Sequence, residues 1–203
     1  MVLAAIHRNG ACKPGYKAVL SAGNIGLFSA VLKEYWPDVI GMHKNSSFRL
    51  FEEFYKANRE GFNLHGIYYN EPAGNGYVLI TGGTEGIVVS GTAAAWVYGT
   101  SRVIGKDRAR IRARDRSVIR LEDDASGIFF DESEGHAFER SRVSATDRSR
   151  IYASDLSVID AGGDSTVYGT GWNRINGFGN ALIKAYTDRK IKLSGNARLE
   201  IIH

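Results

Sequence analysis

Basic residues alternate with other residues along two stretches of this 203-residue chain, 102–120 and 140–150, and they carry its clearest chemical signal. Arginine is a planar fork of donors that binds phosphate or carboxylate through two hydrogen bonds at once. The pattern therefore indicates an anion-binding surface, whose partner is nucleic acid or an acidic protein surface. The residues concerned are even-numbered: Arg102, Lys106, Arg108, Arg110, Arg112, Arg114, Arg116, Arg120, Arg140, Arg142, Arg148 and Arg150.

Two other interpretations account for the same residues. Charged side chains keep the outer face of a strand solvated, and arginines of one coil can pair with acidic residues of the next. A charged face can also serve self-assembly. The formal net charge of +4 does not decide among the three interpretations, because 22 acidic residues accompany the 26 basic ones.

Other residues with catalytic or ligating chemistry form no recognisable motif. The five histidines and the single Cys12 lack the spacing of a zinc site, and the glycines match neither a dinucleotide-binding loop nor a Walker loop. The sequence therefore predicts a non-enzymatic protein without metal or cofactor. It has no secretory signal and no run of about 20 apolar residues that would span a membrane. We expect a cytoplasmic protein, of the producing cell or of an infected one.

An eight-residue period from Gly86 to His203 predicts how the arginines are positioned. The consecutive units RVSATDRS (142–149) and RIYASDLS (150–157) illustrate it. The second position is usually Ile, Val or Leu, and the fourth is usually small or apolar. This alternation predicts a short strand with odd-numbered residues inward and even-numbered residues outward. Asp or Gly at the sixth position and Ser or Ala at the eighth predict a corner.

A strand of about four residues followed by a corner, repeated without insertion, predicts a β-solenoid. Coils must stack about 4.8 Å apart, because one unit buries too little surface to fold alone. We favour two units per coil over three. Gly127 and Gly135 interrupt the apolar second position, and we expect Phe129 and Phe130 to fill the gap. Acidic residues at the sixth position are expected to bond backbone amides: Asp107, Asp115, Asp123, Asp131, Glu139, Asp147 and Asp155.

The repeated unit V/I-x-A-x-G/D-x-S-x, seen at 111–117 and 151–157, resembles the octad-repeat β-solenoid proteins of bacteria and phages. The resemblance covers residues 86–203. It implies a fold, since those proteins share no activity that could be carried over. A phage or mobile-element protein that inhibits a host nucleic-acid-handling complex is the role that this resemblance suggests.

Residues 1–85 differ in kind and are expected to form a small α/β or α+β segment that caps the first coil. Helices are predicted over 24–36 and over a segment that is capped at 45–47 and ends at Gly61. The aromatic stripe of the second helix is interpreted as core: Phe48, Phe51, Phe54 and Tyr55. Strands are predicted over 66–70 and 76–81. The chain as a whole is predicted to be mainly β, a single-chain β-solenoid of eight-residue strand–turn repeats over 86–203.

The sequence ends in mid-unit, with no capping element after the last predicted strand. An uncovered coil leaves backbone groups and apolar side chains open to another chain. We expect a homo-oligomer, or docking on a larger complex, through Leu199, Ile201 and Ile202. The alternative function is therefore structural: a virion or filament component that assembles through the ends of the solenoid.

Overall fold

The computed structural model describes residues 23–34, 46–187 and 190–202. The chain divides into two compact units, Met1–Tyr69 and Asn70–His203. Cys12 and the expected helix cap Asn45 lie outside the described residues. No helix among the described residues is long and apolar enough to span a membrane.

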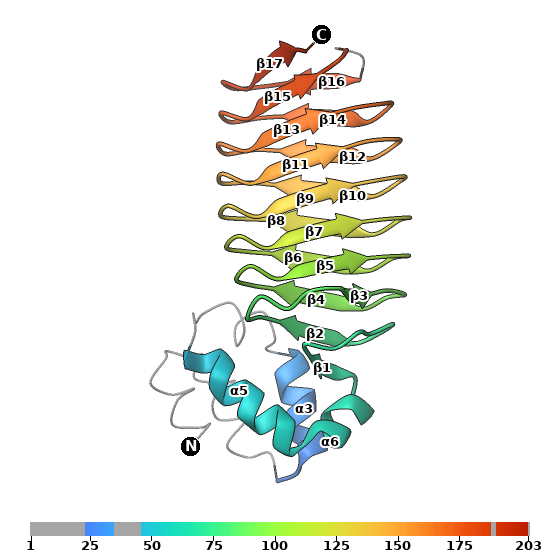
Figure 1. Cartoon of the computed structure of the whole chain (residues 1–203), viewed down its shortest axis with the longest axis vertical. Coiled ribbons are helices and arrows are strands. Elements are labelled where there is room, and N and C mark those ends of the chain that lie inside the picture. Colours follow the sequence, from blue (N-terminus) through green and yellow to red (C-terminus); the bar gives the residue numbers. More distant parts are fainter. Residues whose placement is uncertain (1–22, 35–45, 188–189, 203) are drawn as a thin grey trace. The chain divides into compact units, whose positions relative to one another are not determined.

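Two parallel sheets make up the second unit, and successive strands alternate between them (Figure 1). Sheet A holds the even-numbered strands: β2 (Tyr77–Ile80), β4 (Ala94–Val97), β6 (Arg110–Ala113), β8 (Ser126–Phe129), β10 (Arg142–Ala145), β12 (Val158–Ala161), β14 (Arg174–Gly177) and β16 (Ile191–Leu193). Sheet B holds the odd-numbered strands: β3 (Ile87–Val89), β5 (Arg102–Gly105), β7 (Val118–Leu121), β9 (Glu134–Ala137), β11 (Arg150–Ala153), β13 (Thr166–Gly169), β15 (Leu182–Ala185) and β17 (Arg198–Ile201). The chain is a mainly β protein whose second unit is a β-solenoid, as the sequence predicts.

Neighbouring coils pair each residue with its equivalent two repeat units along the chain. Ile111 pairs with Gly127 in sheet A, and Ile151 pairs with Val167 in sheet B. One coil therefore consists of two repeat units, with one strand in each sheet. The stack also includes β2, upstream of Gly86, which pairs with β4.

Side chains alternate between the core and solvent along the strands. In β6 and β11 the odd-numbered residues are buried and the even-numbered residues are exposed. Serines at the eighth position of the unit are buried as well. Those at 101, 117, 133 and 149 donate their hydroxyl hydrogen to the backbone carbonyl three residues earlier, at 2.6–2.9 Å. These buried hydroxyl groups therefore satisfy backbone carbonyls of the corner from the core side.

Carboxylate ladders run along both rows of corners. Each of the seven acidic residues at the sixth position accepts a hydrogen bond from the backbone N–H of its equivalent one coil earlier, at 2.8–3.1 Å. These residues have φ of 53–57°, in the left-handed region that Asp tolerates better than most residues. Glycine takes the same place at 163, 179 and 195, also with positive φ. The corner chemistry predicted from the sequence is confirmed.

Phe129 fills the space beside the two inward glycines, whereas Phe130 does not. Phe129 is fully buried, and a Cβ added at Gly127 would lie 2.5 Å from its ring. A Cβ at Gly135 would lie 2.7 Å from the same ring. The expectation for Phe130 is wrong, because this even-numbered residue points outward, where the Arg114 guanidinium carbon lies 4.7 Å from its ring centroid.

The first unit contains α3 (Ile25–Glu34), α5 (Ser46–Ala57), α6 (Arg59–Leu64) and β1 (Ile67–Tyr69). Three of the four residues of the aromatic stripe pack on the core: the rings of Phe51, Phe54 and Tyr55 have centroids 5.6–5.9 Å from that of buried Phe62, whereas Phe48 is half-buried. Gly61 does not end the second helix, because α5 ends at Ala57 and α6 continues through Gly61. Its lack of a side chain admits Ile25, whose atoms lie 3.1 Å from where a Cβ would stand.

Replacement of Phe129 tests this packing. We expect Phe129→Ala to lower the free energy of unfolding by about 3–5 kcal/mol, because it leaves a cavity beside two glycines. The matched control Phe130→Ala should cost less than about 1 kcal/mol, because that ring lies on the surface. Gly127→Val in the Phe129→Ala background should recover part of the loss. Denaturant unfolding measures all three, and equal losses for Phe129 and Phe130 would contradict the assignment.

Candidate functional site

The two-sheet coil sends the twelve basic residues to opposite sides of the solenoid. Each strand–corner unit lies in one sheet and the next unit in the other, so their outward residues point away from each other. Sheet A and the corners that follow its strands carry Arg110, Arg112, Arg114, Arg116, Arg142 and Arg148. Sheet B and the corners that follow its strands carry Arg102, Lys106, Arg108, Arg120, Arg140 and Arg150. The basic residues of 102–120, and likewise those of 140–150, therefore do not form one surface.

Half of these residues are paired with carboxylates. The pairs, at 2.5–4.0 Å, are Arg102–Glu85, Lys106–Glu122, Arg114–Asp131, Arg120–Glu122, Arg140–Asp124 and Arg148–Glu132. Hydrogen bonds from Lys106 and then Arg120 lower the pKa of the Glu122 carboxyl. Among the described residues, no ion pair is formed by Arg108, Arg110, Arg112, Arg116, Arg142 or Arg150.

Four arginines gather on the row of corners that leads from sheet B into sheet A. Arg108 and Arg110 lie on one coil, and Arg140 and Arg142 lie two coils further along. Coils stack about 4.8 Å apart, so the two pairs are separated by about 10 Å. All four side chains are exposed. We call these residues the arginine quartet.

Asp124 lies on the coil between the two arginine pairs of the quartet. Arg140 holds it with two hydrogen bonds, Nε to Oδ1 at 2.8 Å and Nη2 to Oδ2 at 2.9 Å. The hydrogen bond from Arg140 lowers the pKa of the Asp124 carboxyl, and the charges of Arg142 and Arg108 act in the same direction. Among the outward, even-numbered residues of this cluster, four positive charges and one negative charge give a formal sum of +3. The ladder carboxylates of the same corners, at 107, 123 and 139, are additional, and the opposite row has three equivalent ones, at 115, 131 and 147.

The opposite row of corners is a useful comparison, because its equivalent positions are more nearly balanced. Three arginines there, at 116, 148 and 150, accompany two glutamates, at 132 and 134, for a formal sum of +1. Glu132 Oε1 lies 2.8 Å from Arg148 Nη2. Glu134 Oε1 lies 2.8 Å from His136 Nε2. The quartet is therefore the more positive of two geometrically equivalent places.

The quartet can hold anions, because Arg108, Arg110 and Arg142 present guanidinium forks without an ion pair from a backbone that the stacked coils fix, while Arg140 is engaged with Asp124. No group of three or more His, Cys, Asp or Glu residues that could bind a metal occurs in the described part of the chain.

In the sequence the quartet is two R-x-R triplets, at 108–110 and 140–142. The two triplets are four repeat units apart. Because a coil consists of two repeat units, this spacing equals two whole coils and places both triplets on the same row of corners. Sequence reasoning missed Arg174, which lies two further coils on from Arg142.

The residues expected to mediate self-association lie in the last coil. Leu199 and Ile201 belong to β17, and Ile202 follows it. Ile201 is 43 % exposed and Leu193 of β16 is 42 % exposed, although odd-numbered residues are buried in the inner coils. The reason is that β16 and β17 each have a neighbouring strand on one side only.

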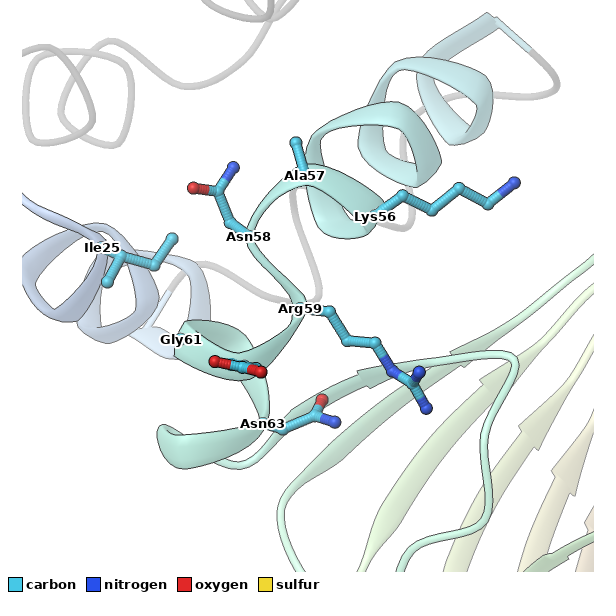
Figure 2. A pocket seen from close by; sticks show the side chains of 8 residues that line it. Ile25, Lys56, Ala57, Asn58, Arg59, Gly61 and Asn63 are labelled. Carbon is cyan, nitrogen blue, oxygen red and sulfur yellow. The ribbon is translucent and has the colours of Figure 1, made fainter.

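A hollow in the helical unit is a weaker candidate site. It is lined by residues around the junction of α5 and α6, among them Lys56, Asn58 and Asn63 (Figure 2). Lys56 extends away from Ile25 (Figure 2). Its Nζ forms an ion pair with Glu52. Asn58 donates to the Phe54 carbonyl, and Asn63 accepts from the Tyr55 hydroxyl. These polar groups are used within the helices, so the hollow offers little for a ligand.

Comparisons with models of protein families, with curated proteins and with solved structures find no match to this chain.

The Arg140–Asp124 contact gives a direct test of the site geometry. Arg140→Gln should raise the pKa of Asp124, because it removes the bidentate guanidinium that stabilises the ionised carboxylate. Carboxyl ¹³C shifts followed through an NMR pH titration report this pKa. Glu122 is the internal control, since Lys106 and Arg120 hold it and its pKa should not move. An Asp124 titration that is the same in both proteins would contradict the contact.

Proposed function

We propose that this chain is a non-enzymatic binding protein that holds nucleic acid on the arginine quartet. The observation that carries the proposal is the gathering of four exposed arginines around one carboxylate, Asp124, on a row of corners. At the equivalent positions of the row on the other side, two glutamates offset two of three arginines. If the charged residues served only to keep the surface solvated, the two rows of corners would not need to differ in outward charge.

Rigidity supports the proposal. Backbone hydrogen bonds between coils and the carboxylate ladders hold the corners in place, so little backbone entropy is lost when an anion binds. Two arginine pairs about 10 Å apart along the stack suit a polymer with recurring phosphates better than a single small anion. An acidic protein surface is the other partner of suitable charge, and the test below separates the two.

The biological setting of the proposal follows from the resemblance of the repeated unit to bacterial and phage solenoids. A phage or mobile-element protein that acts in the cytoplasm and inhibits a host nucleic-acid-handling complex would use such a surface. The absence of a catalytic constellation in the sequence supports a role in binding.

Charge reversal in the quartet tests nucleic-acid binding. We expect the wild-type chain to bind a fluorescein-labelled DNA oligonucleotide with an affinity that falls about 100-fold between 50 and 200 mM salt, as four phosphate contacts predict. Arg108→Glu with Arg140→Glu should weaken binding at least tenfold and flatten the salt dependence. Fluorescence anisotropy measures both quantities.

The matched control is Arg116→Glu with Arg148→Glu on the opposite row, which should bind nearly as the wild type does. Equal losses in the two double variants would contradict the site. Binding of poly-L-glutamate, but not of DNA, would replace nucleic acid with an acidic protein surface.

A second candidate function is self-assembly through the last coil, as a virion or filament component. It is favoured by the exposure of Leu193 and Ile201, whose positions are buried in inner coils. Two such ends could continue each other's sheets, since β16 and β17 are edge strands.

Light scattering tests self-assembly. If two copies associate through this coil, the wild-type chain should have at least twice the mass of one chain, and Leu199→Asp should reduce it to one. This association should persist at high salt, because the contact is apolar. A wild-type mass of one chain at concentrations up to about 100 μM, near the dissociation constant of a weak contact, would contradict this candidate.

A further inference from the structure

The row of corners that carries the quartet continues beyond it with different chemistry. One coil after Arg140 and Arg142 come Leu156 and Val158, and one coil further come Trp172 and Arg174. Trp172 is therefore two coils from Arg140, about 10 Å along the stack. From Arg108 to Trp172 the row spans four coils, or about 20 Å. Arginine pairs and an aromatic residue thus lie on one line.

Trp172 is exposed and lies among cations. Its exposed fraction is 62 %, the largest of any bulky apolar residue described in the solenoid unit. Lys190 Nζ lies 5.4 Å from the centroid of its ring. Arg174, two residues further along, is exposed at the start of β14. A planar apolar side chain beside positive charges is the combination that binds a base and its phosphate together.

Other aromatic residues of the solenoid have a different geometry. On sheet B the rings of His136, Tyr152 and Tyr168 stack on each other, with centroids 5.0 Å apart and planes within 14°. Their faces cover one another, which leaves edges and hydroxyl groups for solvent. Trp172 forms no ring–ring contact with any other described residue. Its indole is therefore available to a flat ligand. Phe178 and Tyr186 are also exposed rings without a ring–ring contact among the described residues, but Trp172 is the one of the three that has a lysine over its ring.

We propose that the quartet and Trp172 form one site for single-stranded nucleic acid, in which the arginines bind phosphates and the Trp172 indole stacks on an unpaired base. This inference rests on the proposed function and narrows its substrate class. Bases of a duplex are stacked on each other, so their faces do not reach an indole outside the helix. Bases of a single strand are accessible, and stacking of one base on an aromatic side chain contributes about tenfold or more in affinity.

The test compares a single-stranded 12-nucleotide oligothymidylate with a 12-base-pair duplex, by fluorescence anisotropy on the full chain. The wild type should bind the single strand more tightly, by about tenfold. Trp172→Leu should lose this preference while its binding to duplex stays the same. Trp172→Phe should retain most of the preference, because stacking requires an aromatic face and not merely an apolar side chain.

Two controls separate stacking from other causes. Phe178→Leu replaces an exposed aromatic residue that follows β14 on the opposite row, and it should have no effect. Leu156→Ser replaces the exposed aliphatic residue between Trp172 and the quartet, and binding should change less than threefold. Circular dichroism melts check that each variant is folded.

The outcomes distinguish this inference from the function on which it rests. Equal affinity of the wild type for both DNAs, with no effect of Trp172→Leu, overturns the inference and leaves quartet-dependent binding intact. A loss of binding in Leu156→Ser, when Trp172→Leu binds as the wild type does, also overturns it, since this pattern indicates aliphatic docking. If the wild type binds neither DNA, the proposed function fails and this inference fails with it.

Discussion

Backbone pairing between equivalent residues of successive coils is the interaction on which the rest of this structure depends. It runs through both sheets from β2 to β17, and the corner carboxylates extend it past the ends of the strands. Asp131, for example, accepts from the amide of Asp115 and donates its own amide to Asp147. Every coil repeats the same register. Side chains at one position of the unit therefore form a straight column, in which successive members are about 4.8 Å apart.

Those columns decide which charges meet. Lys106 lies beside Glu122, Arg140 beside Asp124, and Arg148 beside Glu132, and the two members of each pair are one coil apart. Ion pairs between coils are what we expect if the charged residues only keep the outer face solvated. This interpretation accounts for part of the basic residues. It does not account for the quartet, where three further arginines adjoin the Arg140–Asp124 pair. Exposed pairs of this kind contribute little to stability. Arg108, Arg110 and Arg142, which form no ion pair among the described residues, are available for a ligand.

The solenoid therefore offers a ligand one row of corners with two kinds of side chain on it. Guanidinium groups at one end are suited to phosphate, and the Trp172 indole at the other is suited to a flat aromatic group. The aromatic residues of sheet B stack on each other, so their ring faces are covered and are not open to a ligand. The stacked coils keep the arginine quartet and Trp172 at a fixed separation. A flexible single strand of nucleic acid would therefore adapt its conformation to the protein.

The sequence by itself determined the solenoid, the inward and outward residues, and the acidic corners, because each depends on a local eight-residue pattern. It placed Phe130 in the core, although this residue points outward. It also ended a helix at Gly61, although α6 continues through that residue, which lies against Ile25. The quartet and Trp172 emerged only in three dimensions. Arg108 and Arg142 are distant in sequence and come together because each coil consists of two repeat units, a consequence of how two sheets close around one core. The local pattern determines which side chains alternate, whereas the coil length decides which of them are neighbours.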